Sequence, residues 1–418
     1  MTPSSQDFSA ALLERFLRYV RLCTTSDPQA ADRGVMPSTG GQRDFAELLR
    51  GELAALGLED ARVTEHGYVC ARLPPSPGLE GAPCVCFLAH MDTSEAAPGK
   101  DVHPLVTERY SGAAIPLRDG VVLDPAGDEA LAKAAGETIV HGDGSTLLGA
   151  DDKAGIAEII TALEALRDRP EAAHGPVEVI FSPDEETGHG MDRVPLDWIR
   201  AKAAYTLDGG GAPELEAECF NAYKSDVLFT GVAMHTGTAR PGMVNAVNLA
   251  ADLVSLLPRH ESPETTDGRQ GFFAPISVSG SIERAAVQVF VRDFDSKAME
   301  ERLKTVETLS EAVRRKYRGS TVSVTHTRQY VNMKGGIQKS PPVTALLVEA
   351  VRNAGAEPVF KPIRGGTDGS RLTEMGIPTP NIFTGGHNFH SRREWASLDQ
   401  MILATRTVIE LIILWGKQ

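Results

Sequence analysis

Four short apolar segments of this chain each end directly in a loop rich in histidine, aspartate or glutamate. They run from Cys84 to Ala89, Val177 to Ser182, Ala203 to Leu207 and Thr379 to Phe383. Their β-branched and aromatic content predicts buried strands. Because helical patterns separate them, we expect an α/β fold with a doubly wound, mostly parallel sheet. Ligands bind beyond the carboxyl ends of the strands in such sheets, so the polar loops are predicted to share one site.

The segment 213–328 has a different order of predicted elements. Strands are expected at 227–233, 274–282, 286–291 and 321–325, and helices at 244–257 and 297–315. This βαββαβ order is typical of a ferredoxin-like α+β domain. Since strands with polar loops resume after it, we predict an inserted lid or dimerisation domain at 213–328. A catalytic domain would then be built from 1–212 and 329–418.

The first polar loop reads His90-Met91-Asp92. Residues two apart in an extended segment project to the same side. Asp92 would therefore fix the tautomer of His90 while the other ring nitrogen binds a metal. For such a pair taken alone, a capped turn is the alternative interpretation.

A second polar segment leads into a predicted helix at Asp151-Asp152, within the sequence HGDGSTLLGADDKAGIAE. Two adjacent carboxylates at a buried helix entrance repel each other and are costly to keep ionised. A divalent metal beside them would relieve that cost. The alternative is that Asp152 caps the helix while Asp151 is solvated.

Three further loops contain candidate site residues. The carboxylates of Asp184, Glu185 and Glu186 follow a predicted buried strand, which indicates either a metal ligand beside a general base or a solvated loop. Asp208 begins a loop with three glycines, and His390 follows the last strand.

Together the loops offer five candidate ligands, with Asp92 and Glu185 beside them: His90, Asp151, Glu186, Asp208 and His390. Carboxylates with two imidazoles suit zinc or, less specifically, cobalt or manganese. Two metals that share one bridging carboxylate would explain why five ligands converge. Such a pair can bind a water, lower its pKa and polarise a carbonyl.

In their order and spacing, these motifs resemble those of the co-catalytic dizinc exopeptidases, a family that includes carboxypeptidase G and dipeptidase V. The matching segments are HMD at 90–92, GADDKAG at 149–155, PDEETG at 183–188, DGGG at 208–211 and His390. Within this family the chain is most similar to the tripeptide aminopeptidases. That closer match lies in MVNA at 243–246, VRDFD at 291–295, KPIRGGTDG at 361–369 and FTGG at 383–386.

The resemblance implies a role for each candidate ligand. His90 and Asp208 would bind one zinc and Glu186 and His390 the other, with Asp151 bridging both. Glu185 would be the general base that moves a proton from the bridging water to the leaving amine. Asp92 would orient His90. A cis peptide bond between Asp151 and Asp152 is also implied.

The resemblance further implies substrate-binding residues, mostly in the inserted domain. His235 would reach the active site of a partner subunit and stabilise the oxyanion, although Thr236 follows it where proline is expected. Asn245 and Arg292 would grip the peptide carboxylate, since an arginine fork pairs bidentately with it. Arg364 would approach the same substrate. A surface salt bridge with Asp293 or Asp295 is the alternative for Arg292.

Composition argues against several partners. The formal net charge of -14 leaves no dominant basic surface, so we expect neither nucleic acid nor an anionic membrane as a partner. No stretch approaches the roughly 20 apolar residues of a membrane span, and no secretory signal is recognisable. The five cysteines have no paired spacing, which favours a reducing, cytoplasmic location.

The leading hypothesis is a dizinc aminopeptidase that releases the N-terminal residue of tripeptides and other short peptides, as a homodimer formed through the lid. A dipeptidase or an N-acyl amino acid deacylase would use the same metal site. A binding protein that has lost catalysis would be expected to lack a ligand or Glu185, and this chain has all of them.

Overall fold

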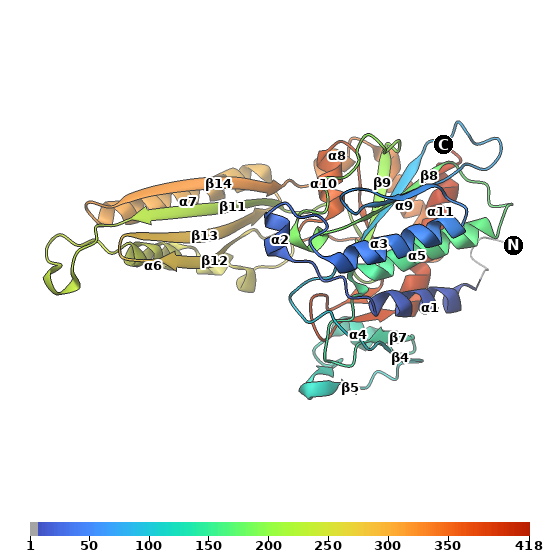
Figure 1. The fold of residues 1–418 in the computed structure, drawn as a ribbon, viewed down its shortest axis with the longest axis horizontal. Coiled ribbons are helices and arrows are strands. Elements are labelled where there is room, and N and C mark those ends of the chain that lie inside the picture. Colours follow the sequence, from blue (N-terminus) through green and yellow to red (C-terminus); the bar gives the residue numbers. More distant parts are fainter. Residues whose placement is uncertain (1–6) are drawn as a thin grey trace. The chain divides into compact units, whose positions relative to one another are not determined.

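The computed structural model describes residues 7–418 and divides into two compact units (Figure 1). The sheet unit contains the chain up to Ala217 together with Gly335–Lys361 and Thr367–Gln418. The inserted unit contains Glu218–Lys334 and Pro362–Gly366. No helix within residues 7–418 is long and apolar enough to cross a membrane.

An eight-stranded sheet forms the centre of the sheet unit, in the order β1-β2-β8-β3-β9-β16-β10-β15. Its strands are β1 (Glu59–Val63), β2 (Val69–Leu73), β3 (Val85–His90), β8 (Val177–Ser182), β9 (Ala203–Gly209), β10 (Glu214–Glu216), β15 (Val359–Phe360) and β16 (Asn381–Phe383). The four apolar segments of the sequence are the adjacent strands β8, β3, β9 and β16, which pair in parallel. The predicted mostly parallel α/β sheet is therefore confirmed.

One strand is shorter than expected. The segment from Thr379 was predicted as a strand, but β16 begins only at Asn381. Pro380 directly precedes it, and a proline has no backbone N–H to donate to a neighbouring strand.

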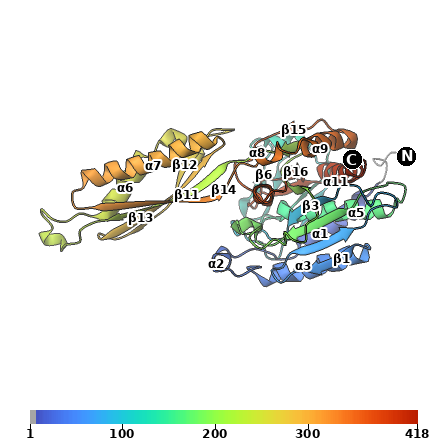
Figure 2. The ribbon, with the colours of Figure 1, turned by 90° about the horizontal axis from the view of Figure 1, so that it is seen from above.

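Helices cover one face of this sheet, and Figure 2 shows α5 beside β3. They are α1 (Ser9–Val20), α3 (Gly40–Ala55), α5 (Ala150–Arg167), α9 (Pro341–Ala354) and α11 (Leu398–Trp415). Alternate strand residues such as Val85, Phe87 and Phe181 point into this largest core. Each such buried side chain contributes about 1.5–3 kcal/mol of hydrophobic stabilisation.

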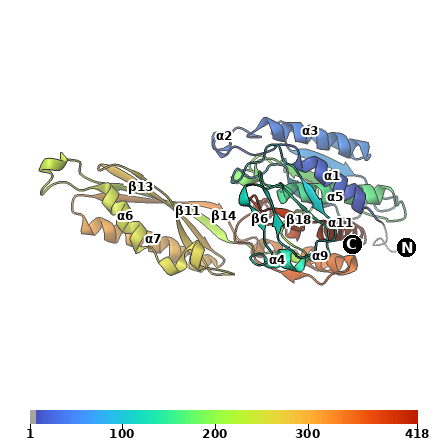
Figure 3. The ribbon, with the colours of Figure 1, turned by 90° about the horizontal axis from the view of Figure 1, so that it is seen from below.

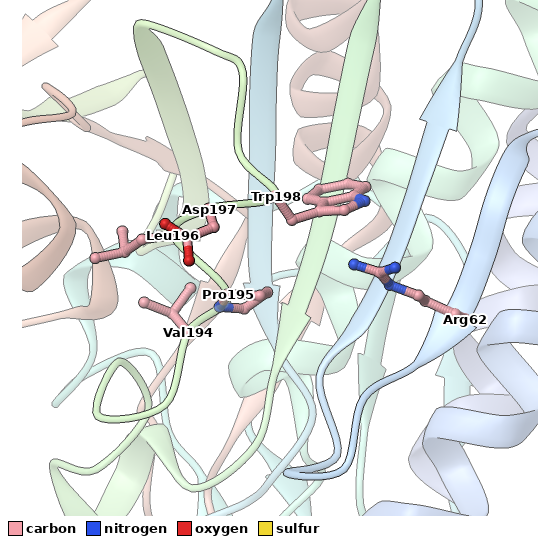
Figure 4. A pocket seen from close by; sticks show the side chains of 6 residues that line it. All are labelled: Arg62, Val194, Pro195, Leu196, Asp197 and Trp198. Carbon is pink, nitrogen blue, oxygen red and sulfur yellow. The ribbon is translucent and has the colours of Figure 1, made fainter.

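The opposite face packs against loops and a short helix. Cys86, Leu88 and Ile180 meet Met191 and Leu372 there, and Leu372 lies in α10 (Asp368–Glu374). At the border of this core is an open hollow of about 620 Å³, lined by Arg62 and by 194–198 (Figure 4). None of the predicted site residues lines it.

Smaller elements surround the sheet. A four-stranded sheet has the order β17-β18-β7-β4. The elements are α2 (Pro28–Asp32), β4 (Leu105–Thr107), β5 (Ile115–Pro116), β6 (Val122–Leu123), α4 (Glu129–Lys133), β7 (Ile139–His141), α8 (Lys334–Ile337), β17 (Gly386–His387) and β18 (Trp395–Ser397). Because β17 and β18 pair with each other, they bracket the loop that carries His390.

The inserted unit is a four-stranded antiparallel sheet with two helices. Along the chain its elements are β11 (Asn221–Thr230), α6 (Ala246–Leu256), β12 (Phe272–Gly280), β13 (Arg284–Asp293), α7 (Ser296–Lys316) and β14 (Thr321–Tyr330). The sheet order is β12-β13-β11-β14, and both helices share one core with it (Figure 3). This is the predicted βαββαβ order of a ferredoxin-like fold.

Candidate metal centre

Strand ends place most of the candidate ligands. His90 is the last residue of β3, Asp208 lies near the end of β9, and Glu186 follows β8 in a short turn. His390 follows β16 and β17, and Asp151 lies at the start of α5. Since parallel strands end at the same edge of a sheet, these residues from distant parts of the chain meet.

The first ligand group consists of His90, Asp151 and Asp208. The Nε2 of His90 lies 2.8 Å from Oδ1 of Asp151 and 3.6 Å from Oδ1 of Asp208. His90 is only 2% exposed, so this group is screened from bulk water.

The second ligand group consists of Asp151, Glu186 and His390. The Nε2 of His390 lies 3.1 Å from Oδ2 of Asp151 and 2.9 Å from Oε1 of Glu186. Asp151 thus presents one carboxylate oxygen to each group. A bridging carboxylate between two metals would have this arrangement.

The donor atoms fit divalent cations. A single ring nitrogen of each histidine faces two carboxylate oxygens, and one N–H cannot be shared well between them. The buried Oε1 of Glu186 makes no hydrogen bond within the described residues, although His390 is close. An imidazole nitrogen beside several carboxylate oxygens suits zinc or a similar transition metal.

Crowding of the carboxylates shifts their proton affinities. Burial raises the pKa of Glu185 well above its ordinary value, that of Glu186 to about 7, and also that of Asp208. Burial also acts on Asp151, but hydrogen bonds from His390 and His90 outweigh it and hold this pKa below its usual range. Bound cations would compensate the clustered negative charge and favour the ionised carboxylates.

Asp92 contacts His90 and also the loop after β8. Its Oδ1 lies 3.3 Å from Nδ1 of His90. The same carboxylate accepts the backbone N–H groups of Glu185 at 3.0 Å and Glu186 at 3.1 Å. The backbone carbonyl of Asp92 also lies 3.1 Å from Nδ1 of His90. Asp92 therefore contacts the ring of one candidate ligand and holds the main chain of two neighbouring site residues. Nothing in the sequence pattern indicated this second contact.

Asp152 also contacts a ligand segment without belonging to either group. Its Oδ2 accepts the backbone N–H of His90 at 3.1 Å, and its Oδ1 accepts that of Gly155 at 3.3 Å. The alternative considered from the sequence, a capping Asp152 beside a solvated Asp151, does not describe the structure: the N-cap of α5 is Gly149, Asp152 lies inside its first turn, and Asp151 faces two histidines. The Asp151–Asp152 peptide bond is cis, as the resemblance implied.

Glu394 is a site residue that the sequence analysis missed. Its carboxylate accepts the backbone N–H groups of Leu148 and Gly149, both at 2.8 Å, and of Asp151 at 3.1 Å. The only signal in the sequence was an acidic residue shortly after His390, and nothing local connects it to a segment near position 150.

Arg292 lies in the inserted unit and is only 8% exposed. Its Nη1 donates to the backbone carbonyls of Tyr223 and Val291, both at 3.1 Å. A surface salt bridge with Asp293 or Asp295, the alternative considered from the sequence, does not describe this buried side chain.

The other three predicted substrate-binding residues also belong to the inserted unit. His235 is exposed, and its Nδ1 accepts the N–H of Gly237 at 3.2 Å. Asn245 caps α6 by accepting the N–H of Val247 at 3.0 Å. Arg364 donates to two backbone carbonyls and one hydroxyl. Each side chain is therefore oriented by a partner within its own unit.

Comparison with known proteins places the chain in a family. Residues 129–413 match the profile of peptidase family M20/M25/M40. The chain is 43% identical over 409 residues to peptidase T of Geobacillus thermodenitrificans, covering 97% of this chain and 98% of the relative. The predicted resemblance is confirmed at this level.

Solved structures share the fold. A tripeptidase from Staphylococcus aureus aligns with a TM-score of 0.77 at 20% identity, covering 98% of this chain and 99% of the other. Aminopeptidase PepT from Bacillus cereus aligns with a TM-score of 0.74 at 21% identity, with the same coverage. The chain therefore belongs to peptidase family M20/M25/M40, in the group of its members named peptidase T.

Proposed function

We propose that the chain is a dizinc aminopeptidase that releases the N-terminal residue from tripeptides and other short peptides. The observation that carries this proposal is the pair of ligand groups that share Asp151, in a chain 43% identical to a peptidase T. The name of the Staphylococcus aureus tripeptidase supports the same substrate class.

In this proposal His90 and Asp208 would hold one zinc and Glu186 and His390 the other, with Asp151 shared between the two sites. Cobalt or manganese would be possible substitutes. Two bound cations would polarise the substrate carbonyl and lower the pKa of a water held between them. The residues of the chain then have to position the substrate and move protons.

Glu185 is proposed as the group that moves the proton. Its carboxylate takes a proton from the attacking water, whose oxygen bonds to the carbonyl carbon of the first peptide bond. It then delivers that proton to the amine nitrogen as the C–N bond breaks, and returns to the ionised state. Asp92 supports this role because it holds the backbone N–H of Glu185 at 3.0 Å.

Four residues are proposed to bind the substrate. Arg292 and Asn245 would grip the carboxylate of the peptide. Arg292 is buried, and its Nη1 donates to two backbone carbonyls, which supports this role by fixing the guanidinium in place. Arg364 would shape the same region. His235 would stabilise the oxyanion in the active site of a partner subunit.

We further propose a cytoplasmic homodimer formed through the inserted unit. Strand β12 is an edge of its sheet, and Ile276 and Val278 on it are 52% and 51% exposed. Exposed apolar edge strands are open to pairing with another chain, which supports a dimer that would bring His235 to its partner.

The experiment is hydrolysis of a matched peptide series by the metal-stripped protein, with and without added zinc. The series contains a dipeptide, a tripeptide, a tetrapeptide and an N-acetylated tripeptide. We expect zinc-dependent release of the N-terminal residue, fastest from the free tripeptide. Preference for the acetylated peptide would indicate a deacylase, preference for the dipeptide a dipeptidase, and no hydrolysis with zinc bound would reject the enzyme proposal.

A further inference from the structure

Glu394 is a buried carboxylate that holds main chain instead of a cation. It is 2% exposed and forms no ion pair within residues 7–418. Its partners are the three backbone N–H groups at Leu148, Gly149 and Asp151. Hydrogen bonds to a carboxylate of this kind are about twice as strong as those between neutral groups. The start of α5, which carries the shared ligand, is therefore fixed from outside its own helix.

The segment that carries Glu394 also carries His390. The backbone N–H of Glu394 donates to the carbonyl of Ser391 at 3.2 Å and closes a turn. The hydroxyl of Ser391 donates to the carbonyl of Asn388 at 2.7 Å. This compact turn leaves few ways for His390 to move independently of Glu394. Through Glu394, the His390 turn is joined to a residue 243 positions earlier in the chain.

The two ligand groups differ in what else holds them. His90 and Asp208 of the first group lie in strands β3 and β9 at the centre of the sheet. Glu186 lies in a short turn and His390 in a loop, where its φ of 58° is in the left-handed region. Asp92 fixes the turn with Glu186. The turn that carries His390 is connected to the backbone of Asp151 through Glu394.

We propose that Glu394 is a positioning residue that assembles the second ligand group by joining the His390 turn to the backbone of Asp151. It does not touch the reacting atoms. Its loss weakens the second metal site much more than the first, because two of the three ligands of the first, His90 and Asp208, lie in strands of the sheet. This rests on the ligand set of the proposed function.

The test is titration of the metal-free protein with Zn²⁺ by calorimetry in Glu394→Gln. This substitution keeps the shape of the side chain but replaces one acceptor oxygen with an NH₂ group that faces a backbone donor. We expect two binding events for the unaltered protein. In the variant, the event that His390→Ala removes should weaken by about 10- to 100-fold, as for other residues that orient ligands. The other event should change less than about 3-fold.

Glu178→Gln is the matched control. Glu178 is also a buried glutamate, 1% exposed, and it accepts the backbone N–H groups of Arg200 at 2.9 Å and Ala201 at 3.1 Å. The Glu178→Gln variant should have a lower melting temperature, but both zinc-binding events should be unchanged. Glu394→Asp, which retains a carboxylate, should recover part of the lost affinity and covers the case in which Glu394→Gln does not fold.

The outcomes separate the role of Glu394 from the ligand set itself. Equal weakening of both events in Glu394→Gln, or unchanged binding, would overturn the positioning role. If Glu394→Asp binds the second zinc no more tightly than Glu394→Gln, that would also count against the positioning role. Fewer than two zinc ions in the unaltered protein would instead reject the proposed ligand set.

Discussion

At the residue scale, the proposed chemistry depends on Glu185. Its backbone is fixed by Asp92, and its charge interacts with those of Asp208 and His90. Glu185 is absent from both ligand groups. The side chain is thus free to carry a proton while its neighbour Glu186 faces a histidine. The structure therefore places only Glu186 of these two adjacent glutamates in a candidate ligand group.

Glu185→Gln should therefore abolish most turnover without removing metal. We expect kcat on a tripeptide to fall by about 10²- to 10⁴-fold, the range that general acid–base groups contribute. Zinc content and melting temperature should stay close to those of the unaltered enzyme. Comparable kcat in the variant would remove Glu185 from the role of base, whereas loss of zinc would make it a ligand.

His390→Ala should lose the second zinc. Without His390, the second ligand group keeps only Glu186 and Asp151, and Asp151 is shared with the first group. We therefore expect metal analysis after dialysis to give about one zinc per chain instead of two. His387→Ala is a useful control because His387 lies in the same region, stacked on Trp395 with ring centroids 4.1 Å apart. It should keep both ions. Two zinc ions in His390→Ala would show that the ligand has been misassigned.

At the element scale, α5 both carries Asp151 and fills the core. Almost every residue from Ala150 to Leu166 is buried, including Glu158, whose two carboxylate oxygens have no hydrogen-bond partner among the described residues. Burial raises the pKa of Glu158 well above its ordinary value. A buried, unpaired acid in a helix packed on all sides should make the stability of the sheet unit depend on pH.

The sign of that dependence follows from linkage. A raised folded-state pKa means that the folded protein binds the proton more tightly than the unfolded chain. The stabilisation from protonated Glu158 is complete below the pKa of a glutamate in the unfolded chain, about 4.3. It is lost as the pH rises through the pKa of Glu158 in the folded protein. Glu158→Gln removes the ionisable group and should therefore gain stability relative to the unaltered protein as the pH rises.

We expect this gain to reach about 1–3 kcal/mol at pH 8, the usual scale for an unfavourably buried polar group, and to be small near pH 5. Urea unfolding of the zinc-loaded protein at the two pH values measures it. Glu349→Gln is the control, because Glu349 lies at an exposed position on α9. If the free energy of unfolding of Glu158→Gln differs from that of the unaltered protein by the same amount at both pH values, the charge of Glu158 must be compensated in the folded protein.

The elements also differ in how well the sequence predicted them. Long apolar strands and amphipathic helices were located to within a few residues because hydrophobic periodicity is a local property. One exception is β11, which begins at Asn221 although its strand was expected at 227–233. Strands of two or three residues, such as β10, β15 and β17, carry too few residues to show a period. Their pairing depends on which neighbour the folded chain brings beside them.

At the scale of the whole molecule, the homodimer is the main prediction. Ile276→Lys with Val278→Lys places charges on the edge strand β12 and should give a monomer in sedimentation. If His235 acts in the partner's site, turnover should fall by at least about 10-fold while zinc content is unchanged. Leu196→Lys is the control, since Leu196 is a 42% exposed leucine of the sheet unit. A fully active monomer would contradict the role of His235 in a partner subunit.

The sequence by itself determined the order of strands and helices and the polar loops that follow the parallel strands, because both depend on the residues within short stretches of the chain. It also carried the motifs that relate the chain to its family. Only the tertiary structure decided which oxygen of Asp151 faces which histidine, and that Asp92, Asp152 and Glu394 hold the main chain of neighbouring site residues. These contacts join residues 62 to 243 positions apart, and no local pattern can encode a hydrogen bond whose two ends meet only after the sheet has formed.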